Sequence, residues 1–572
     1  MKRLLARTPR SALQAGMLVV AASLYAAVRS TTPLVWNDSV TLSILSEAVP
    51  GLDRFDGPAL WATLEEAFAT PAREGYRPLS VFLAGAGMRY FASGGEIFNW
   101  AFPVGVVIAL CILALYATAR RLGCSAVFAA LATLLVVASS PFVASSWVIV
   151  AGIQAIVPLF ICASLLAYWR LADSGYRSVA LHVALLALFI AGPWFREFIG
   201  VSPLLVGLLD LLTRRRPTAV TLIAALGFLH AVYPGWIVQP FVATAPLLPV
   251  YEMGFLGGRL SADVGVQVSA LGRSVAQAEF VTAQLLVLLP STVLAMLALA
   301  PAARALPRGR DVVFLLAWTI ASLLPFFRVY TQETHLLYPL VPLAILVGLA
   351  AQALWHAAAR AGRLATPARF VLGAALLTGA ADQALNYPNS VQLVTAINDG
   401  MQRAAERIRH SVPRGSAIVG NALHLEDLRW LSGGHFVPYW TVESGVPRSR
   451  VEAGQALLTP ERLAGLFRAS PDAVYLLDMD YDFLPGKRAY HAHRFVHREG
   501  IVTRKLWTLD AIRVSYPFAD PLKNAVPRPL TGVLFAPDLE NDFYRGRARS
   551  GAPFMREVYV TYTLYRVIRV DS

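Results

Sequence analysis

Long apolar runs alternate with short polar segments along the first two thirds of the chain. These runs predict membrane-spanning helices at about residues 12–29, 98–118, 125–143, 149–169, 178–194, 198–212, 218–238, 281–301, 311–327, 336–356 and 370–386. From about residue 395 the pattern changes. Helical patterns at 401–409 and 460–467 alternate with short strand-like runs at 417–419 and 473–477, and a β-rich stretch follows at 558–569. We therefore predict about eleven membrane spans followed by a small α/β domain.

This change of pattern divides the chain into two predicted domains. Residues 1–390 form a transmembrane domain whose first loop covers residues 30–97, and residues 391–572 form the α/β domain. Within the first loop, residues 59–68 and 79–91 mix apolar faces with scattered charges, which predicts helices lying along the membrane surface. The predicted fold class is a polytopic α-helical membrane protein with a C-terminal α/β domain.

Arginines gather in short clusters beside the apolar runs and indicate the orientation of the chain. The clusters are Arg120–Arg121, Arg170 with Arg177, Arg214–Arg216, Arg304 with Arg308 and Arg310, and Arg360 with Arg363 and Arg369. If the N-terminus is cytoplasmic, every cluster falls in a cytoplasmic loop, as the positive-inside rule requires. An odd number of spans then places residues 30–97, 239–280 and the α/β domain on the extracytoplasmic face of a bacterial inner membrane.

Composition supports a membrane protein and argues against two other classes. With 56% hydrophobic and 15% charged residues among 572, the chain is too apolar for an ordinary soluble domain. Nucleic-acid binding is not expected from the charge of +14, because the arginines lie beside apolar runs without a basic, aromatic-interleaved motif.

The first apolar run is nearly 20 residues long and predicts a retained anchor rather than a cleaved signal peptide. Cys111, Cys124 and Cys162 are expected to be core residues.

Four polar groups near the predicted extracytoplasmic surface are candidates for chemistry. Asp38, in Trp36-Asn37-Asp38, follows the first span and could act as a general base or cap the next helix. Arg77, after Tyr76, could clamp a phosphate or anchor to lipid headgroups.

The other two groups lie at later helix boundaries. Arg196 and Glu197 occupy a tight turn between two spans, where they could face a polar cavity or pair with each other. The segment from Arg328 to His335 contains Glu333 and opens the span from about residue 336, although a histidine there is more often a surface residue. On the predicted topology, all four groups share one compartment.

The order of these motifs resembles a family of membrane O-mannosyltransferases whose animal members carry tetratricopeptide repeats. The resemblance rests on Trp36-Asn37-Asp38, Tyr76-Arg77-Pro78-Leu79, Asn99, Ser140-Pro141 with Trp147, Arg196-Glu197 with Pro203 and Asp210, and Glu333 with Tyr338. It covers about residues 1–360, and no tetratricopeptide array follows. The chain departs from the family at Asn37, where a second acid is usual, at Arg196, where a lysine is usual, and at His335, where an arginine is common.

The resemblance implies a GT-C glycosyltransferase, which takes a sugar from a polyprenyl-phosphate donor and transfers it with inversion on the extracytoplasmic side. It implies that Asp38 is the catalytic base. A lipid-linked anionic donor needs a cation at headgroup depth, for which Arg77, Arg196 and Arg328 are candidates. Tyr76 and His335 would support the site. Glu197 and Glu333 would orient the arginines or bind a divalent cation, and the sequence has no dedicated metal motif.

Two other function classes remain open at this point. A transporter or flippase of a lipid-linked saccharide would use charged residues as a substrate path, although the predicted spans are nearly free of charge. A catalytically inactive membrane scaffold is the other alternative. The acceptor of a transferase would be a protein, a glycan or a lipid.

The α/β domain has two clusters of potential metal ligands. Asp478, Asp480 and Asp482 follow an apolar strand and lack the glycine and terminal glutamate of a calcium loop, which favours a solvated strand end. His491, His493 and His497 have neither helical nor zinc-finger spacing. We expect this domain to recognise the acceptor or a partner.

Overall fold

The computed structural model describes residues 97–137, 155–232, 309–323, 337–359, 399–420, 431–440, 460–481, 500–517 and 555–570, with a few isolated positions between them. Three predicted spans, at about residues 12–29, 281–301 and 370–386, lie outside the described residues. The two surface helices expected in the first loop lie outside them as well, apart from isolated positions.

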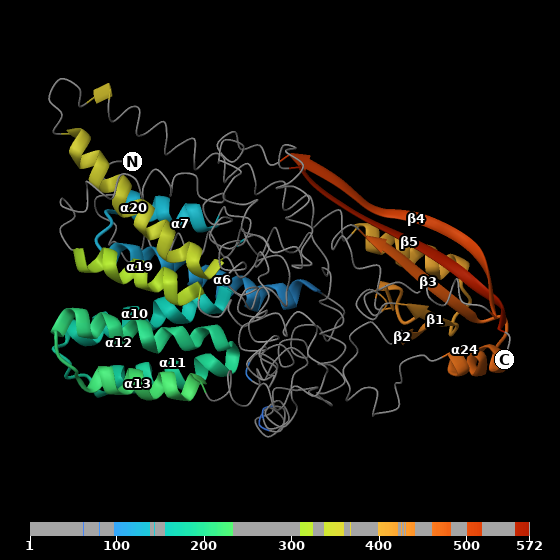
Figure 1. Ribbon diagram of the computed structural model, residues 1–572, viewed down its shortest axis with the longest axis horizontal. Coiled ribbons are helices and arrows are strands. Elements are labelled where there is room, and N and C mark those ends of the chain that lie inside the picture. Colours follow the sequence, from blue (N-terminus) through green and yellow to red (C-terminus); the bar gives the residue numbers. More distant parts are fainter. Residues whose placement is uncertain are drawn as a thin grey trace, which may run out of the picture.

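The other eight predicted spans all coincide with helices in the described residues (Figure 1). These are α6 (Ile97–Arg121), α7 (Ala126–Val137), α10 (Ile156–Asp173), α11 (Val179–Phe195), α12 (Val201–Arg214), α13 (Ala219–Val232), α19 (Gly309–Leu323) and α20 (Leu337–Ala359). The span expected from residue 198 begins with a short 3₁₀ helix, η2 (Glu197–Gly200), before α12.

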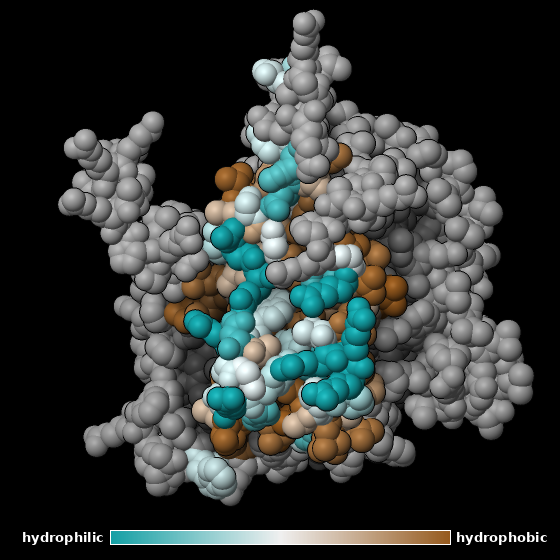
Figure 2. Space-filling model, turned by 90° about the vertical axis from the view of Figure 1, so that its left-hand side faces the viewer, coloured by the Kyte–Doolittle hydropathy of each residue, from teal (hydrophilic) through white to brown (hydrophobic). Residues whose placement is uncertain are grey.

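Two of these helices are long and apolar enough to cross a membrane by length and composition, at Ile156–Asp173 and Leu337–His356. Shorter apolar helices cover Ala126–Val137, Val179–Phe195 and Ala219–Ala231. Large apolar side chains point outward from several helices, and Val127 and Val179 are each 74% exposed. Figure 2 shows such hydrophobic residues around the sides of one end of the molecule. An exterior of this kind suits lipid rather than water, which agrees with a membrane location.

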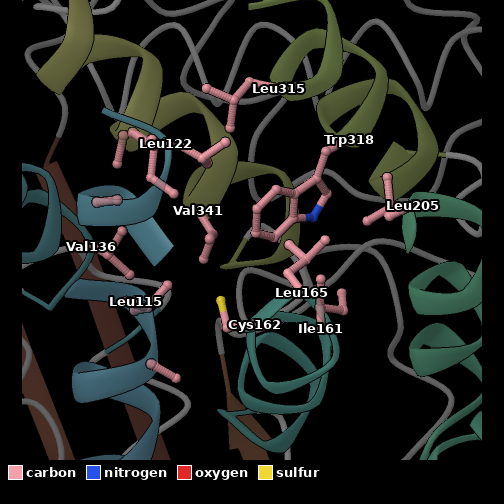
Figure 3. Close-up of a cluster of buried hydrophobic side chains, with 14 of the residues drawn as sticks. Leu115, Leu122, Val136, Ile161, Cys162, Leu165, Leu205, Leu315, Trp318 and Val341 are labelled. Atoms are coloured by element: carbon pink, nitrogen blue, oxygen red, sulfur yellow. The ribbon is translucent and has the colours of Figure 1, made fainter. Parts of the chain in front are cut away.

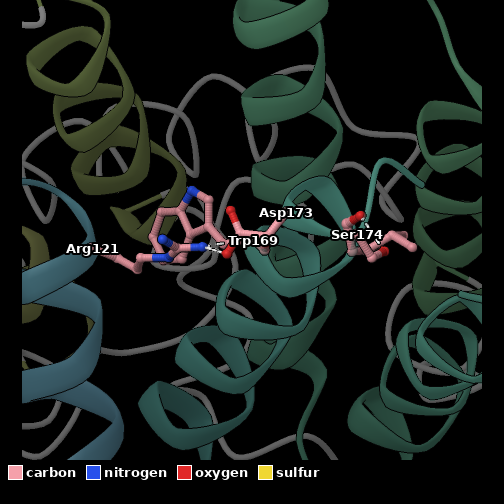
Figure 4. A network of polar contacts seen from close by, with 5 residues as sticks. Arg121, Trp169, Asp173 and Ser174 are labelled. Carbon is pink, nitrogen blue, oxygen red and sulfur yellow. Dashed lines mark hydrogen bonds and ion pairs between the residues drawn. The ribbon is translucent and has the colours of Figure 1, made fainter. Parts of the chain in front are cut away.

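The described loops that carry arginine clusters meet at one end of the helix group, while Arg304, Arg308 and the cluster of Arg360, Arg363 and Arg369 lie outside the described residues. Arg121, at the end of α6, forms an ion pair with Asp173, at the end of α10, and donates to the Trp169 carbonyl (Figure 4). Gln352 of α20 donates to the Gly123 carbonyl at 3.1 Å, and its side-chain oxygen accepts from the backbone N–H that begins α7. We call this end, formed by residues 120–125, 170–178, 214–218 and 309–311, the arginine end.

The interior of the helix group is apolar and closely packed. All three cysteines are buried, which confirms the expectation that they are core residues. The indole of Trp318 lies in the centre of the cluster, surrounded by side chains of α10 and α20 such as Leu165 and Val341 (Figure 3). Gly348 of α20 lets that helix approach α7 so closely that an added Cβ would lie 2.9 Å from the Phe128 carbonyl oxygen.

A buried carboxylate ties two loops of the arginine end together. Asp210 of α12 is fully buried and accepts hydrogen bonds from the hydroxyls of Tyr168 at 3.2 Å, Tyr176 at 3.3 Å and Thr221 at 2.7 Å. Thr218 is a fourth hydroxyl donor. Because burying a carboxylate is costly unless its oxygens accept hydrogen bonds, this set of donors is what allows Asp210 to lie there.

The C-terminal residues form a five-stranded mixed sheet in the order β2-β1-β3-β5-β4. The strands are β1 (Ala417–Gly420), β2 (Val437–Trp440), β3 (Val474–Tyr481), β4 (Ile501–Pro517) and β5 (Met555–Val570). β1 runs parallel to β2 and β3, and β5 runs antiparallel to β3 and β4.

Helices cover both faces of this sheet. Residues 399–411 are helical, and their apolar side chains pack with Tyr475, Leu477 and Trp507 on one face. On the other face, α24 (Pro460–Ala469) places Leu463 against β1 and β3. Within the described residues, β1, β3, β5 and both helices coincide with segments that the sequence pattern predicts, while the domain as a whole stays a prediction. The sequence pattern missed β2 and β4. The extracytoplasmic location of this region stays a prediction.

We expect Asp210→Ala to lower the free energy of unfolding by about 2–4 kcal/mol, because the buried Tyr168 hydroxyl and three half-buried hydroxyls lose their shared acceptor. Asp173→Ala provides a matched control, since its carboxylate is 55% exposed and removing such an ion pair costs about 0–1 kcal/mol. Thermal unfolding of both variants in the same detergent measures the difference. Equal midpoints for the two variants would show that the buried network does not stabilise the fold.

Candidate functional site

The structure describes one of the predicted charged site residues in full. The side chain of Arg196 and the backbone of Glu197 are described, whereas Asp38, Tyr76, Arg77, Arg328, Glu333 and His335 lie outside the described residues. The candidate site is therefore built from the turn around Arg196 and from the elements that contact it.

Arg196 lies at the point where α11 ends and η2 begins. Its backbone is extended, with φ −155° and ψ 131°, so the helix stops at Phe195. Its N–H donates to the Gly192 carbonyl at 3.0 Å, and its carbonyl accepts from the Ile199 N–H at 3.0 Å. These two bonds close the turn on both sides of the residue. We call residues 195–200 the Arg196 turn.

The guanidinium of this turn is buried, since Arg196 is only 6% exposed. A buried cation is costly in an apolar surrounding and is retained where a polar group or an anionic ligand compensates it. Within the described helix group, the other arginines are exposed at the opposite end. The position of Arg196 thus fits a role that uses its charge.

Gly192, in the last turn of α11, and Gly200, at the end of the Arg196 turn, permit very close packing. A Cβ added to Gly192 would lie 2.3 Å from Cγ2 of Ile199, and one added to Gly200 would lie 2.7 Å from Cβ of Ala231. Atoms at such distances overlap, so the turn depends on residues without side chains at these positions. The backbone that carries Arg196 is therefore held in one arrangement by its neighbours.

The Arg196 turn contacts the beginning of α20. The rings of Phe198 and Tyr338 have centroids 4.8 Å apart, and both residues are buried. The predicted site residues Glu333 and His335 precede the start of α20 by a few positions in the sequence. The structure thus places the Arg196 turn beside the first residues of α20, while Arg328, Glu333 and His335 lie outside the described residues.

Aromatic rings surround the turn on its other sides. Trp194 packs against His230 of α13, with centroids 5.6 Å apart, and Phe195 packs against Phe160 of α10 at 5.3 Å. Of these residues, only Trp194 is of a type that is enriched where a membrane protein meets the headgroup region. The sequence reading did not single out Phe198 or His230, since no local pattern marks contacts between helices far apart in the chain.

The Arg196 turn lies at the opposite end of the helix group from the arginine end. α11 has 17 residues, so its two ends are about 25 Å apart at 1.5 Å per residue. Asp210, which the sequence resemblance grouped with Arg196, lies with the arginine end and is saturated by hydroxyl donors. It is a structural residue there and not part of the candidate site.

Among the described residues, no group of three or more histidine, cysteine or acidic side chains could hold a metal ion. Asp478 and Asp480 lie within the paired part of β3, opposite Thr563 and Thr561 of β5, rather than beyond the end of the strand. Asp482 and the three nearby histidines lie outside the described residues. A divalent cation near Glu197 and Glu333 stays an open alternative from the sequence.

No protein-family model and no curated protein matches the chain. Among solved structures, it is similar to ArnT from Cupriavidus metallidurans bound to undecaprenyl phosphate, with 13% identity and a TM-score of 0.46 over 81% of this chain and 92% of that one. It is also similar to the oligosaccharyltransferase of Archaeoglobus fulgidus in the apo form, with 13% identity and a TM-score of 0.49 over 81% and 69% of the two chains.

The TM-scores lie below 0.5, where such likeness does not establish shared detail. The function proposed below therefore rests on the residues of this chain.

We expect Gly192→Ala to disturb the Arg196 turn and to lower the free energy of unfolding by about 1–3 kcal/mol, as overpacking in a core does. Gly309→Ala is the matched control, because nothing lies within 4 Å of a Cβ added there. Thermal unfolding in detergent checks both variants. A midpoint for Gly192→Ala that equals that of the control would mean that the turn can relax around a methyl group.

Proposed function

We propose that this chain is an inverting glycosyltransferase that moves a sugar from a polyprenyl-phosphate donor to an acceptor hydroxyl on the extracytoplasmic face of the membrane. The observation that carries the proposal is the buried Arg196, held beside the start of α20 at the end of the helix group away from the arginine loops. The motif order in the sequence supports the same class of enzyme.

A polyprenyl-phosphate sugar places specific demands on its enzyme. Its tail stays in lipid, while its phosphate needs a cationic partner at headgroup depth. Arg196 is the candidate that the structure describes, and its guanidinium could donate two parallel hydrogen bonds to one phosphate. Arg77 and Arg328 would add positive charge from the first loop and from the segment before α20. Tyr76, Glu197, Glu333 and His335 would orient these groups.

Transfer with inversion needs a base on the side of the anomeric carbon opposite the phosphate. In this proposal, Asp38 accepts the proton of the acceptor hydroxyl as that oxygen bonds to the anomeric carbon. The bond from the anomeric carbon to the phosphate oxygen breaks at the same time, and polyprenyl phosphate leaves. The arginines would stabilise the negative charge that develops on the leaving phosphate.

We expect Asp38→Asn to reduce transfer of labelled sugar from polyprenyl-phosphate donors by about 10²- to 10⁴-fold, because the amide cannot accept the proton. The measurement uses membranes that contain equal amounts of each variant. Full activity of Asp38→Asn would place the base elsewhere. If the unmodified chain transferred no sugar from any polyprenyl-phosphate donor, the transporter and scaffold alternatives would replace this proposal.

We expect Arg196→Gln to reduce the same transfer by about 10²-fold or more, as loss of a charge-stabilising donor does. Arg196→Lys should retain part of the activity, because it keeps the charge but loses the planar pair of donors. Arg409→Gln, an exposed change on the helix of residues 399–411, is the control and should leave transfer unchanged. Activity of Arg196→Gln equal to that of the control would contradict a role in donor binding.

The proposed orientation can be tested with introduced cysteines, because the three native cysteines are buried. Ser470, after α24, and Ser174, at the arginine end, are both exposed. In intact cells, a membrane-impermeant maleimide should label Ser470→Cys, whereas Ser174→Cys should react only after permeabilisation. The reverse pattern would place the α/β domain in the cytoplasm and overturn the orientation.

A further inference from the structure

The arginine end forms a dense positive surface on the helix group. The described residues place eight exposed arginines there, from three interhelical loops and the start of α19: Arg120, Arg121, Arg170, Arg177, Arg214, Arg215, Arg216 and Arg310. Figure 2 views this end directly and shows hydrophilic residues gathered across its centre, with hydrophobic residues around them. The positive-inside rule accounts for positive loops on one side of the membrane, but it does not account for the conformations of these loops.

Few acidic groups in the described part of this end balance the arginines. Asp173 pairs with Arg121, and Asp311 lies 3.5 Å from Arg310. Asp210 is fully buried and its oxygens accept from four hydroxyls. Within the described ranges, the remaining arginines form no ion pair with a carboxylate, so the surface keeps a large positive excess.

The two central loops of this surface are held in fixed conformations. Tyr176 and Arg215 adopt left-handed backbone conformations, with φ 64° and 56°, which non-glycine residues adopt only where the surroundings hold them. The Tyr176 hydroxyl donates to Asp210, and the guanidinium of Arg214 lies 4.1 Å above the Tyr176 ring. The loop of residues 174–178 and the loop of residues 214–218 are thus joined side by side.

Arg177, Arg215 and Arg216 therefore lie in two loops of fixed conformation, next to the apolar sides of α11 and α12. Val179 at the start of α11 and Leu211 near the end of α12 are both exposed beside them. A ligand that fits both features carries a phosphate for the arginines and hydrocarbon chains for the helix sides. Arginine suits this task because its planar donors match phosphate oxygens in pairs.

We propose that the arginine end is a binding surface for the phosphate headgroups of anionic phospholipids, with Arg177, Arg215 and Arg216 as its centre. The acyl chains lie along the exposed apolar sides of α11 and α12. This surface is distinct from the proposed donor site, because it lies at the other end of the helices, and it does not depend on whether the chain transfers sugar.

The test compares lipid binding of the full chain and of variants in nanodiscs of phosphatidylcholine to which phosphatidylglycerol is added. We expect the unmodified chain to bind phosphatidylglycerol in preference to phosphatidylcholine, with an affinity that falls as salt is raised. Arg177→Gln/Arg215→Gln/Arg216→Gln should lower that affinity by about 100-fold, since each arginine near an anionic surface contributes roughly fivefold. The corresponding triple change to lysine should retain most of the affinity, because it keeps the charge.

The control carries the same number of glutamines at exposed arginines away from this end, Arg409, Arg414 and Arg468, and should bind phosphatidylglycerol as the unmodified chain does. Inorganic phosphate at the same concentration should compete weakly, because it lacks acyl chains. The proposal is overturned if the triple glutamine variant and the control bind phosphatidylglycerol with equal affinity. It is also overturned if the unmodified chain binds phosphatidylglycerol and phosphatidylcholine equally. If the triple glutamine variant fails to fold, the triple lysine variant provides the test: loss of its preference for phosphatidylglycerol also overturns the proposal.

Discussion

The cost of placing charge in hydrocarbon governs the arrangement of this molecule. A charged side chain at the centre of a bilayer costs several kcal/mol unless it is compensated, so the charges of a spanning helix collect at its ends. In the described helix group from α6 to α20, the exposed arginines lie at one end, and the middle of the group is an apolar core around Trp318. Both the predicted orientation and the candidate site follow from this separation of charge.

Three charged residues of the described helix group are nevertheless buried: Asp210, Arg196 and Asp311, which lies beside Arg310 at the arginine end. The structure treats Asp210 and Arg196 differently. Asp210 has four hydroxyl donors around it, which is close to the number of hydrogen bonds that a carboxylate can accept. It has no remaining capacity for a ligand and therefore serves to join loops. Arg196 instead lies in a turn that glycines hold tightly against neighbouring helices and that contacts the start of α20 through Phe198. The turn that carries the buried cation thus contacts the start of α20, which the candidate residues Glu333 and His335 precede in the sequence.

The helices of this chain could be predicted from sequence because each needs only an apolar run of sufficient length.

The strand β4 was missed for a physical reason. Its pairing with β5 shifts register between Val502 and Thr503, between Lys505 and Trp507 and between Asp510 and Ile512, and each shift interrupts the alternation that marks a strand. The contact between Phe198 and Tyr338 is equally hidden, since 140 residues separate the two rings and no local pattern encodes their packing. Asp210 was a landmark of the family resemblance beside Arg196, yet motif order does not indicate at which end of a helix a residue lies.

The length of α11 bears on which kind of sugar donor could reach Arg196. With the start of α11 at the headgroups of one leaflet, about 25 Å of helix does not span a hydrocarbon layer of about 30 Å. Arg196 then lies at or just inside the opposite headgroup boundary rather than in bulk water. A water-soluble sugar nucleotide would have to leave water to reach a guanidinium at that depth. A lipid-linked phosphate would already reside there, so such a placement of Arg196 would suit the proposed polyprenyl-phosphate donor better than a soluble one.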